Sequence, residues 1–521
     1  MDVVDRKLLR DLSTLRGQVI TIGLVVAAGV AAYVTLQGTW TSLDSSKSAY
    51  YERQRFADVF AQLKRAPMSV ADDLQQIEGV SEVDVRIVDA VMVPIDTLRE
   101  PASGLVVSLP DHGSPRLNQI HVVAGVLPEP GRPDDALVLE SFVRSHGLEI
   151  GDTVPVVING TIRPIRITGI GMSPEHVFPA PTTGIFSDEQ RFAVFWMRES
   201  VMAAAFDMTN AFNDAAIRLQ PEASLDAVLA AVDRVLEPYG GVGAFGRKDQ
   251  ISNSILEGEL AGLETMATVA PMIFLGVAAF LLNVVLSRLV MLQRAQIATM
   301  KAVGYPKVTI GLHYVKLVCL IALGGSALGL ALGTYLGGEM TEMYTKYFRF
   351  PVLAFELDPR VMSIGVAVSV LAGVVGAVAS ATRVAKLPPA EAMRPAAPPN
   401  YGSSVLDRLG VHRMVPPAAR MIVREIERQP LRTTLSIIGI SFAVAIMVIA
   451  RVYSDAMSLL LDMQFQQAWR EDVMVSFLDP LSDRAVGELE RMPGVLYAEG
   501  LRMVPVRFVH EGRKRESAIF G

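Results

Sequence analysis

The side chains that most often carry out chemistry are few and scattered in this sequence. His112, His121, His146 and His176 fall in one polar segment but lack the spacing of metal ligands. Cys319 is the only cysteine, so neither a disulfide nor a cysteine metal site can form within the chain. The motifs G-x-x-x-x-G-K-[ST], H-E-x-x-H and G-x-S-x-G are absent from the sequence. We therefore expect no catalytic, cofactor-binding or metal-binding residue.

One short segment, residues 292–304, has the composition of a docking element. It lies between Arg288 and Lys316, a stretch without any acidic residue. Its residue types favour a helix up to Gly304, which fits a C-cap, and Pro306 prevents the helix from continuing. Apolar side chains recur at the spacing of one helix face, at Ile297, Met300 and Val303. Such a helix fits either the groove of a partner protein or the anionic headgroups of a membrane.

The segment is flanked by long stretches without charged residues. Each of five such stretches is close to the ~20 residues that an α-helix needs to cross the hydrocarbon core of a membrane. We expect helices there, because backbone polar groups in lipid have no water to bond. The first stretch exceeds the apolar region of a signal peptide, which favours an uncleaved first span. The five predicted spans are Gly17–Leu43, Thr265–Ser287, Leu317–Gly338, Val361–Thr382 and Thr433–Ala450.

Basic residues set the expected orientation of these spans. Segment 383–432 carries nine basic and four acidic residues, and both the N-terminus and segment 288–316 are basic. The positive-inside rule places these three segments in the cytoplasm, so residues 44–264 and the chain after Ala450 lie outside. The spans contain no acidic side chain, which argues against a proton- or sodium-coupled carrier.

The outer segment 44–264 reads as a mixed α/β domain. A strand–helix–strand order occurs within residues 57–95 and again within 213–248. Residues 104–205 between them are rich in β-branched residues, and Asn159-Gly160 between two alternating runs indicates a hairpin. The predicted fold class is an α-helical membrane protein with a large mixed α/β extracytoplasmic domain, made of strand–helix–strand units and a β-rich insert.

A weak internal repeat divides the chain. Leu9–Leu12 recurs as Val423–Ile426 at an offset of 414, and Ala57–Val59 falls on Glu471–Val473 at the same offset. We expect two repeats in one polypeptide, which would reach roughly 790–800 residues. The expected divisions are 1–43 (cytoplasmic N-terminus and first span), 44–264 (outer domain), 265–384 (spans two to four), 385–432 (Pro-rich cytoplasmic linker), 433–451 (fifth span) and 452–521 (start of a second, incomplete outer domain).

Small residues recur every four positions in two of the spans. Such faces let helix backbones approach closely in a membrane, and they predict close packing of the third span on the fourth. The face on the third span consists of Gly325, Gly329, Gly333 and Gly337, and that on the fourth of Gly365, Ser369, Gly373 and Ala377.

Residues 292–304 resemble the coupling-helix signature R-x-x-E-I-x-x-L-K/R-A-x-G of the FtsX/MacB-like ABC transporter permeases, a family with LolC/LolE-like members. The matching residues are Arg294, Ile297, Lys301, Ala302 and Gly304, while Met300 replaces the leucine and Gln296 stands where glutamate is common. Leu387–Arg394 resembles the L-x-P-A-E-A-L-R that follows the fourth span, and Arg428–Thr433 resembles an R-x-x-x-R-T that begins a first span. With the order of spans, the resemblance covers nearly the whole chain, as a duplicated two-repeat form.

The resemblance implies a non-catalytic permease subunit of the bacterial plasma (inner) membrane. Its partner would be a separate cytoplasmic ABC ATPase, in two copies, which binds the ATP; membrane lipid and a periplasmic adaptor protein are further partners, and nucleic acid is not. The outer domain would be a MacB-like periplasmic core domain with a porter-like part. The implied ATPase-coupling residues are Arg294, Ile297, Met300, Lys301 and Gly304, with Ile297 and Met300 buried in the ATPase and Arg294 and Lys301 at the rim.

Two functions remain open on this resemblance. The first is the export or extraction of a hydrophobic or lipid-linked substrate, such as a lipoprotein, lipid, peptide or drug, by mechanical transmission from the ATPase. The second is FtsX-like regulation of an extracytoplasmic cell-wall hydrolase.

The lack of any phosphate-binding motif gives a first prediction. Purified alone in detergent, the chain is expected to bind no ATP, because no glycine-rich loop surrounds a phosphate group. Titration with a fluorescent ATP analogue checks this, and specific, saturable binding would show that the chain itself handles nucleotide.

Overall fold

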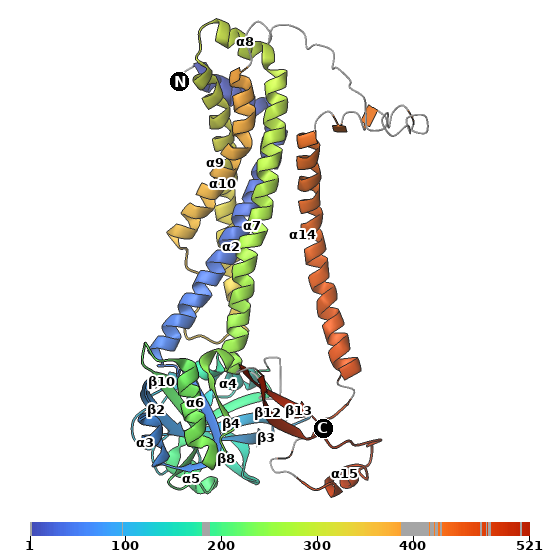
Figure 1. The fold of residues 1–521 in the computed structure, drawn as a ribbon. Helices are drawn as coiled ribbons and strands as arrows, with labels where there is room; N and C mark the ends of the chain where they lie inside the picture. Colours follow the sequence, from blue (N-terminus) through green and yellow to red (C-terminus); the bar gives the residue numbers. More distant parts are fainter. Residues whose placement is uncertain are drawn as a thin grey trace. The chain divides into compact units, whose positions relative to one another are not determined.

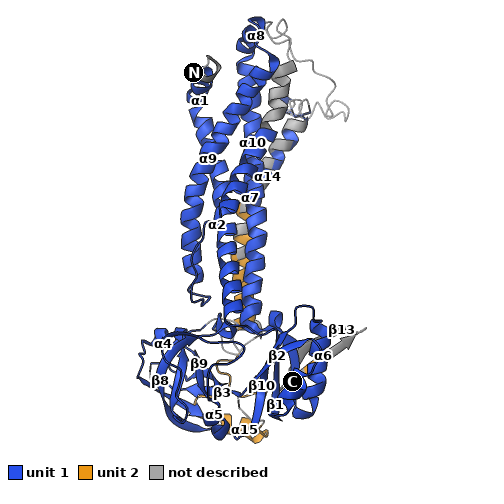
Figure 2. Ribbon diagram, turned by 90° about the vertical axis from the view of Figure 1, so that its left-hand side faces the viewer, with its two compact units in different colours: residues 1–446 blue, residues 447–521 orange. Residues whose placement is uncertain are grey.

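The computed structural model describes residues 3–95, 97–179 and 188–386, and beyond them 416, 421–422, 426–427, 430–468, 471–475, 477, 481–510 and 513–520. It contains two compact units, Met1–Ile446 and Met447–Gly521 (Figure 2). Three sequence features lie wholly or partly outside the described residues: the segment Leu387–Arg394, most of the predicted linker and the start of Arg428–Thr433.

Among the described residues, three helices are long and apolar enough to cross a membrane, and they contain the first three predicted spans: α2 (Arg16–Arg53), α7 (Ile251–Leu292) and α9 (Lys307–Tyr344). A fourth helix, α10 (Pro359–Lys386), contains the fourth stretch, and α14 (Pro430–Asp462) contains the fifth. Helix α2 packs against α7 and α9, and α10 packs against the same two helices (Figure 1). A short helix, α1 (Val3–Thr14), precedes this four-helix bundle.

Helix α7 joins the outer domain to the bundle without interruption. Its 42 residues correspond to roughly 63 Å at 1.5 Å per residue, about twice the thickness of the hydrocarbon core. The sequence predicts this long helix, because residues 251–287 contain few helix-breaking residues apart from Pro271. The outer half of α7 therefore extends well beyond the predicted span.

The third and fourth spans pack against each other as predicted, and the hydroxyl of Ser326 in α9 donates to that of Ser369 in α10 at 3.1 Å. The glycine face of the third span, however, packs against α2, which corrects its expected partner. A Cβ atom at Gly325 would lie 2.7 Å from the carbonyl oxygen of Gly23, and one at Gly329 would lie 2.7 Å from that of Ala27. At Gly333 it would lie 2.8 Å from the Cβ of Val34, and at Gly337 it would meet the ring of Phe355. Glycines later in α9 contact residues later in α2, so the two helices run parallel. On α10, Gly365 lies against Tyr33 of α2 and Gly373 against Val318 of α9.

The first sheet of the outer domain has four antiparallel strands in the order β11-β1-β10-β2. Two strand–helix–strand units interlock in it, as β1–α3–β2 and β10–α6–β11, and both helices pack on the same core. The elements are β1 (Val59–Pro67), α3 (Val70–Gln75), β2 (Val80–Arg86), β10 (Ala211–Leu219), α6 (Leu225–Leu236) and β11 (Gly243–Gly246).

The second sheet has seven strands in the order β5-β8-β6-β9-β4-β3-β7, and β7 also pairs with β8. Six of its strands therefore close into a ring around an apolar core, with β5 attached outside. The elements are β3 (Val88–Val93), β4 (Ala102–Leu109), β5 (His121–Gly125), β6 (Asp135–Leu139), α4 (Glu140–His146), β7 (Thr153–Ile158), β8 (Thr161–Met172), β9 (Phe192–Arg198) and α5 (Glu199–Ala205). The hairpin predicted at Asn159-Gly160 connects β7 and β8, and both residues have positive φ, 45° and 74°.

An aromatic cluster joins the outer domain to the outer ends of the helices. Tyr50 and Tyr51 of α2, Phe56 after it, and Tyr344 and Phe348 at the end of α9 belong to one buried core. Burial raises the pKa of both tyrosine hydroxyls, Tyr50 and Tyr51, above the usual value, so these rings are neutral at any physiological pH.

The second unit holds the outer part of α14, the short helix α15 (Arg484–Leu489) and a hairpin of β12 (Met503–His510) and β13 (Arg513–Phe520). The repeat predicted a strand near Glu471–Val473, and the structure forms none at 471–475. In the first unit, β1 is paired on both sides, by β10 and β11, which come more than 140 residues later in the chain. Among the described residues, 471–475 have no such partners, and an isolated strand is not stable.

The packing of α9 on α2 gives the second prediction. Gly329→Ala is expected to cost about 1–3 kcal/mol of stability, since the added methyl group meets the α2 backbone and cannot be accommodated by a rotamer change. Gly324→Ala is the matched control, because nothing lies within 4 Å of its Cβ position and alanine is the better helix former. Thermal unfolding in detergent checks both variants; equal midpoints would contradict the close approach.

Candidate functional site

The segment that resembles the coupling helix forms a separate short helix, α8 (Arg294–Ala302). A single residue, Gln293, separates it from α7, with φ −92° and ψ 11°. At the other end Gly304 has φ +99°, and the N–H of Tyr305 donates to the carbonyl of Met300 at 3.1 Å. Gly304 therefore ends the helix in the left-handed conformation that favours glycine.

The apolar face of α8 packs on this chain's own helices. Ile297 is 1% exposed and belongs to the same core cluster as Leu289 of α7 and Ile310 and Tyr314 of α9. Met300 is partly buried against that cluster. A helix of nine residues is not stable alone in water, so this face is needed to hold α8 in place. The expectation that a partner ATPase buries Ile297 therefore does not fit this structure.

The exposed surface around α8 is apolar and basic. The side chains of Met291, Leu292, Val303 and Val308 are 66%, 72%, 74% and 77% exposed. We name these four residues the tip surface. They are flanked by Lys301 and Lys307, and burial together with the Lys307 charge lowers the pKa of Lys301. Several exposed apolar side chains in one short region of the chain are typical of a binding surface.

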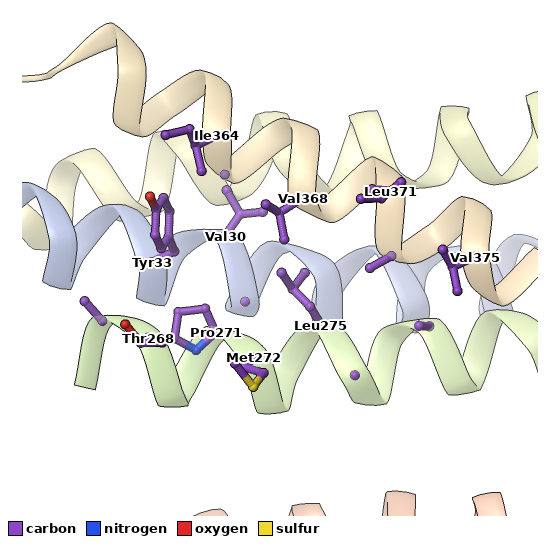
Figure 3. Close-up of a pocket in the computed structure, with 16 residues that line it drawn as sticks. Val30, Tyr33, Thr268, Pro271, Met272, Leu275, Ile364, Val368, Leu371 and Val375 are labelled. Atoms are coloured by element: carbon purple, nitrogen blue, oxygen red, sulfur yellow. The ribbon is translucent and has the colours of Figure 1, made fainter. Parts of the chain in front are cut away.

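An apolar groove of about 520 Å³ lies between α2, α7 and α10 (Figure 3). Its lining falls within the predicted spans, and polar groups are few: the hydroxyls of Tyr33 and Thr268. Pro271 in α7 lines it and has no N–H to donate to the carbonyl of Ala267, another lining residue. The other labelled lining residues are Val30, Met272, Leu275, Ile364, Val368, Leu371 and Val375.

On the outer side, residues 173–178 link the domain to the helices. The side-chain amide of Gln250, just before α7, donates to the carbonyl of Glu175 at 2.8 Å. The N–H of Phe178 donates to the hydroxyl of Ser252 in α7 at 2.8 Å. The N–H of Arg349, after α9, donates to the carbonyl of Val177 at 2.7 Å. One short segment of the outer domain is thereby bonded to the outer ends of both helices.

The same segment is tied to the first sheet by a buried ion cluster. Arg86 of β2 donates two bonds of 2.6 Å to the carboxylate of Glu175 and one of 2.7 Å to Asp214 of β10. Burial alone would raise the pKa of Glu175, but the charge and bonds of Arg86 hold it below the usual value. Burial raises the pKa of Asp214, while Arg86 opposes this. Burial lowers the pKa of the adjacent His176 to about 4, so this ring is neutral at pH 7.

The other residues singled out in the sequence do not assemble into a chemical site. His146 bonds to the carbonyl of Gln190 at 2.9 Å, and His176 packs near Phe192 and Trp196. Cys319 is a partly buried free thiol. In the part of the chain that the structure describes, no three His, Cys, Asp or Glu side chains gather in a way that could hold a metal ion.

Comparison with known proteins agrees with the sequence motif. Residues 268–389 match the family model described as FtsX-like permease C-terminal, a range that includes α8, α9, α10 and most of α7. Residues 268–389 therefore form a domain similar to the C-terminal domain of FtsX-like permeases. Members are membrane-embedded, generally non-catalytic permeases of ABC transporters that work with a cytoplasmic ATPase. No curated protein matches the sequence.

Solved structures are similar to part of the chain at low identity. The extracellular domain of the noncanonic ABC-type transporter YknZ from Gram-positive bacteria is 10% identical, over 36% of this chain and 97% of that chain, with a TM-score of 0.23. The periplasmic region of MacB from Actinobacillus actinomycetemcomitans is 10% identical, over 39% and 95%, with a TM-score of 0.25. A domain of a putative permease protein from Porphyromonas gingivalis is 15% identical, over 36% and 83%, with a TM-score of 0.22.

The burial of Ile297 gives the third prediction. Ile297→Asp is expected to destabilise the chain by several kcal/mol, because it places an unpaired carboxylate in an apolar core. Gln296→Asp introduces the same charge one residue earlier, at an exposed position, and is expected to change stability by less than about 0.5 kcal/mol. Thermal unfolding of the two variants in detergent separates these cases. Equal stability would mean that Ile297 is not buried within the permease.

Proposed function

We propose that this chain is the membrane subunit of an ABC transporter and docks a cytoplasmic ATPase through the tip surface. The observation that carries this is the position of the tip surface within the FtsX-like domain, on a loop that contains no acidic residue. The four exposed apolar side chains would enter a groove of the ATPase, with Lys301 and Lys307 at its rim. Ile297 and Met300 would contribute indirectly, by fixing α8, which connects Met291 and Leu292 to Val303 and Val308.

The connection from α8 to the outer domain supports mechanical transmission. Helix α7 runs from the ATPase side to Gln250, where residues 173–178 bond to it, and the ion pairs of Arg86 continue the connection into the first sheet. Directional bonds and buried ions resist sliding better than an apolar contact does. Movement of α8 by an ATPase would therefore displace the outer domain. Two ATPase copies would serve two such halves, the second supplied by the second repeat.

The apolar groove supports a hydrophobic or lipid-linked substrate. An acyl chain would match its size and its lack of polar groups. On this proposal the transporter exports or extracts a lipoprotein, lipid, peptide or drug from the membrane. The alternative is regulation of a cell-wall hydrolase. In that case, adding a lipidic compound would not change the rate of ATP hydrolysis by the complex.

The docking role of the tip surface gives the fourth prediction. Val303→Asp is expected to weaken binding of the ATPase that co-purifies from native membranes by at least about tenfold, since a charge would enter an apolar contact. Permease stability should not change, because Val303 is 74% exposed. Ile162→Asp, at a 65% exposed position of the outer domain, is the control and should bind normally.

Binding is measured by biolayer interferometry with the permease in lipid nanodiscs, together with its stimulation of ATP hydrolysis. If Val303→Asp retains both, the tip surface is not the ATPase contact.

A further inference from the structure

A buried polar network centred on Asp11 connects α1 to the base of α8. Asp11 is 6% exposed, and its Oδ2 accepts from Nζ of Lys7 at 2.5 Å and lies 3.0 Å from Nε2 of His313 in α9. Its Oδ1 accepts from Nε2 of Gln293 at 2.9 Å. Three segments that are distant in the sequence therefore meet at one carboxylate.

Gln293 is the residue on which the direction of α8 depends. Its backbone N–H donates to Leu289 at 2.9 Å and so completes α7, while its carbonyl accepts from Ile297 at 3.0 Å and begins α8. Its side chain does not cap α8. The amide oxygen instead accepts from Lys7 at 2.8 Å and from the hydroxyl of Tyr314 at 3.0 Å. The hinge between the two helices is thus held from α1 on one side and from α9 on the other.

The chemistry of the network suits a positioning role. Burial would raise the pKa of Asp11, but the hydrogen bonds from His313 and Lys7, together with the Lys7 charge, hold it below the usual value, so it is ionised at pH 7. Bonds to an ionised acceptor are short and directional, whereas an apolar contact such as that of Leu8 tolerates sliding. Burying the charged carboxylate of Asp11 costs free energy. In return, its hydrogen bonds restrict α1 to a single arrangement against Gln293 and α9.

We infer that Asp11 is a positioning residue that fixes the orientation of α8 relative to α9, which makes α1 part of the unit that presents the tip surface. This inference rests on the proposed function only where the ATPase is concerned. The orientation itself is a property of the permease alone.

The test measures the orientation of α8 directly. Spin labels at Gln296, an exposed position of α8, and at Leu323, a 48% exposed position of α9, report the distance between the two helices in a Cys319→Ser background. Pulsed EPR on the full chain in nanodiscs is expected to give a narrow distribution for the parent. Asp11→Asn keeps the shape but removes the charge, and it should broaden or shift that distribution. Arg10→Gln, an exposed charge removed from the neighbouring position of α1, should leave it unchanged.

Gln293→Met serves as a second variant if Asp11→Asn does not insert or fold. It removes the amide at the hinge, keeps the Asp11 contacts with Lys7 and His313, and should broaden the distribution in the same way. Asp11→Glu restores the charge and should bring the distribution back towards that of the parent. Normal distributions for both Asp11→Asn and Gln293→Met would overturn the inference.

The ATPase readout separates this inference from the proposed function. If docking depends on the orientation of α8, Asp11→Asn should weaken ATPase binding by about tenfold when about one molecule in ten keeps the competent orientation, because the apparent affinity falls with that fraction. A broadened distribution with unchanged binding supports the positioning role but contradicts docking through α8. An unchanged distribution with weakened binding contradicts the positioning role and leaves docking in place.

Discussion

The parallel packing of α9 on α2 is the contact on which the rest of the first unit depends. Apolar side chains gain little by leaving lipid, so two helices in a membrane associate through close packing and hydrogen bonds. The glycine face of α9 provides both close packing and hydrogen bonding. Without side chains it leaves room for Val30 and Val34 of α2, and its backbone carbonyls stay accessible as acceptors. The hydroxyl of Thr35 donates to Gly333 at 3.2 Å across this contact.

Each end of this helix pair is extended by polar and aromatic contacts. At the end near α8, Asp11 and His313 join α1 to α9, and Gln293 joins both to the start of α8. At the outer end, the aromatic cluster and residues 173–178 attach the outer domain to α2, α7 and α9. The chain therefore provides a continuous set of directional contacts from α8 to the first sheet. The proposed transmission of movement from α8 to the outer domain would depend on these contacts.

Much of this architecture follows from the sequence, because the features concerned are local. Charge-free stretches give the spans, the scarcity of breakers in 251–287 gives the long α7, and Asn159-Gly160 gives the β7–β8 hairpin. The α8 segment and its end at Gly304 also follow from residue types and spacing.

The features that the sequence did not predict depend on contacts between residues that are distant in the chain. An amphipathic helix has an apolar face, but periodicity does not say whether Ile297 meets a partner or the chain's own α7 and α9. The glycines predict close packing without naming α2 as the partner. His313 and Asp11 are separated by 302 residues, and no spacing rule relates them. The strand predicted at 471–473 was wrong, since strand formation depends on pairing partners.

On the proposed function, ATP binding by a partner ATPase moves the outer part of this chain through α7. The most direct measurement places spin labels at Ser254, an exposed position at the outer end of α7, and at Leu460, an exposed position of α14. Pulsed EPR then compares the nucleotide-free complex with the complex trapped by ATP and vanadate. The account predicts a shift of the distance distribution that requires both the ATPase and ATP. A distribution that stays the same while the ATPase is bound and trapped would contradict it.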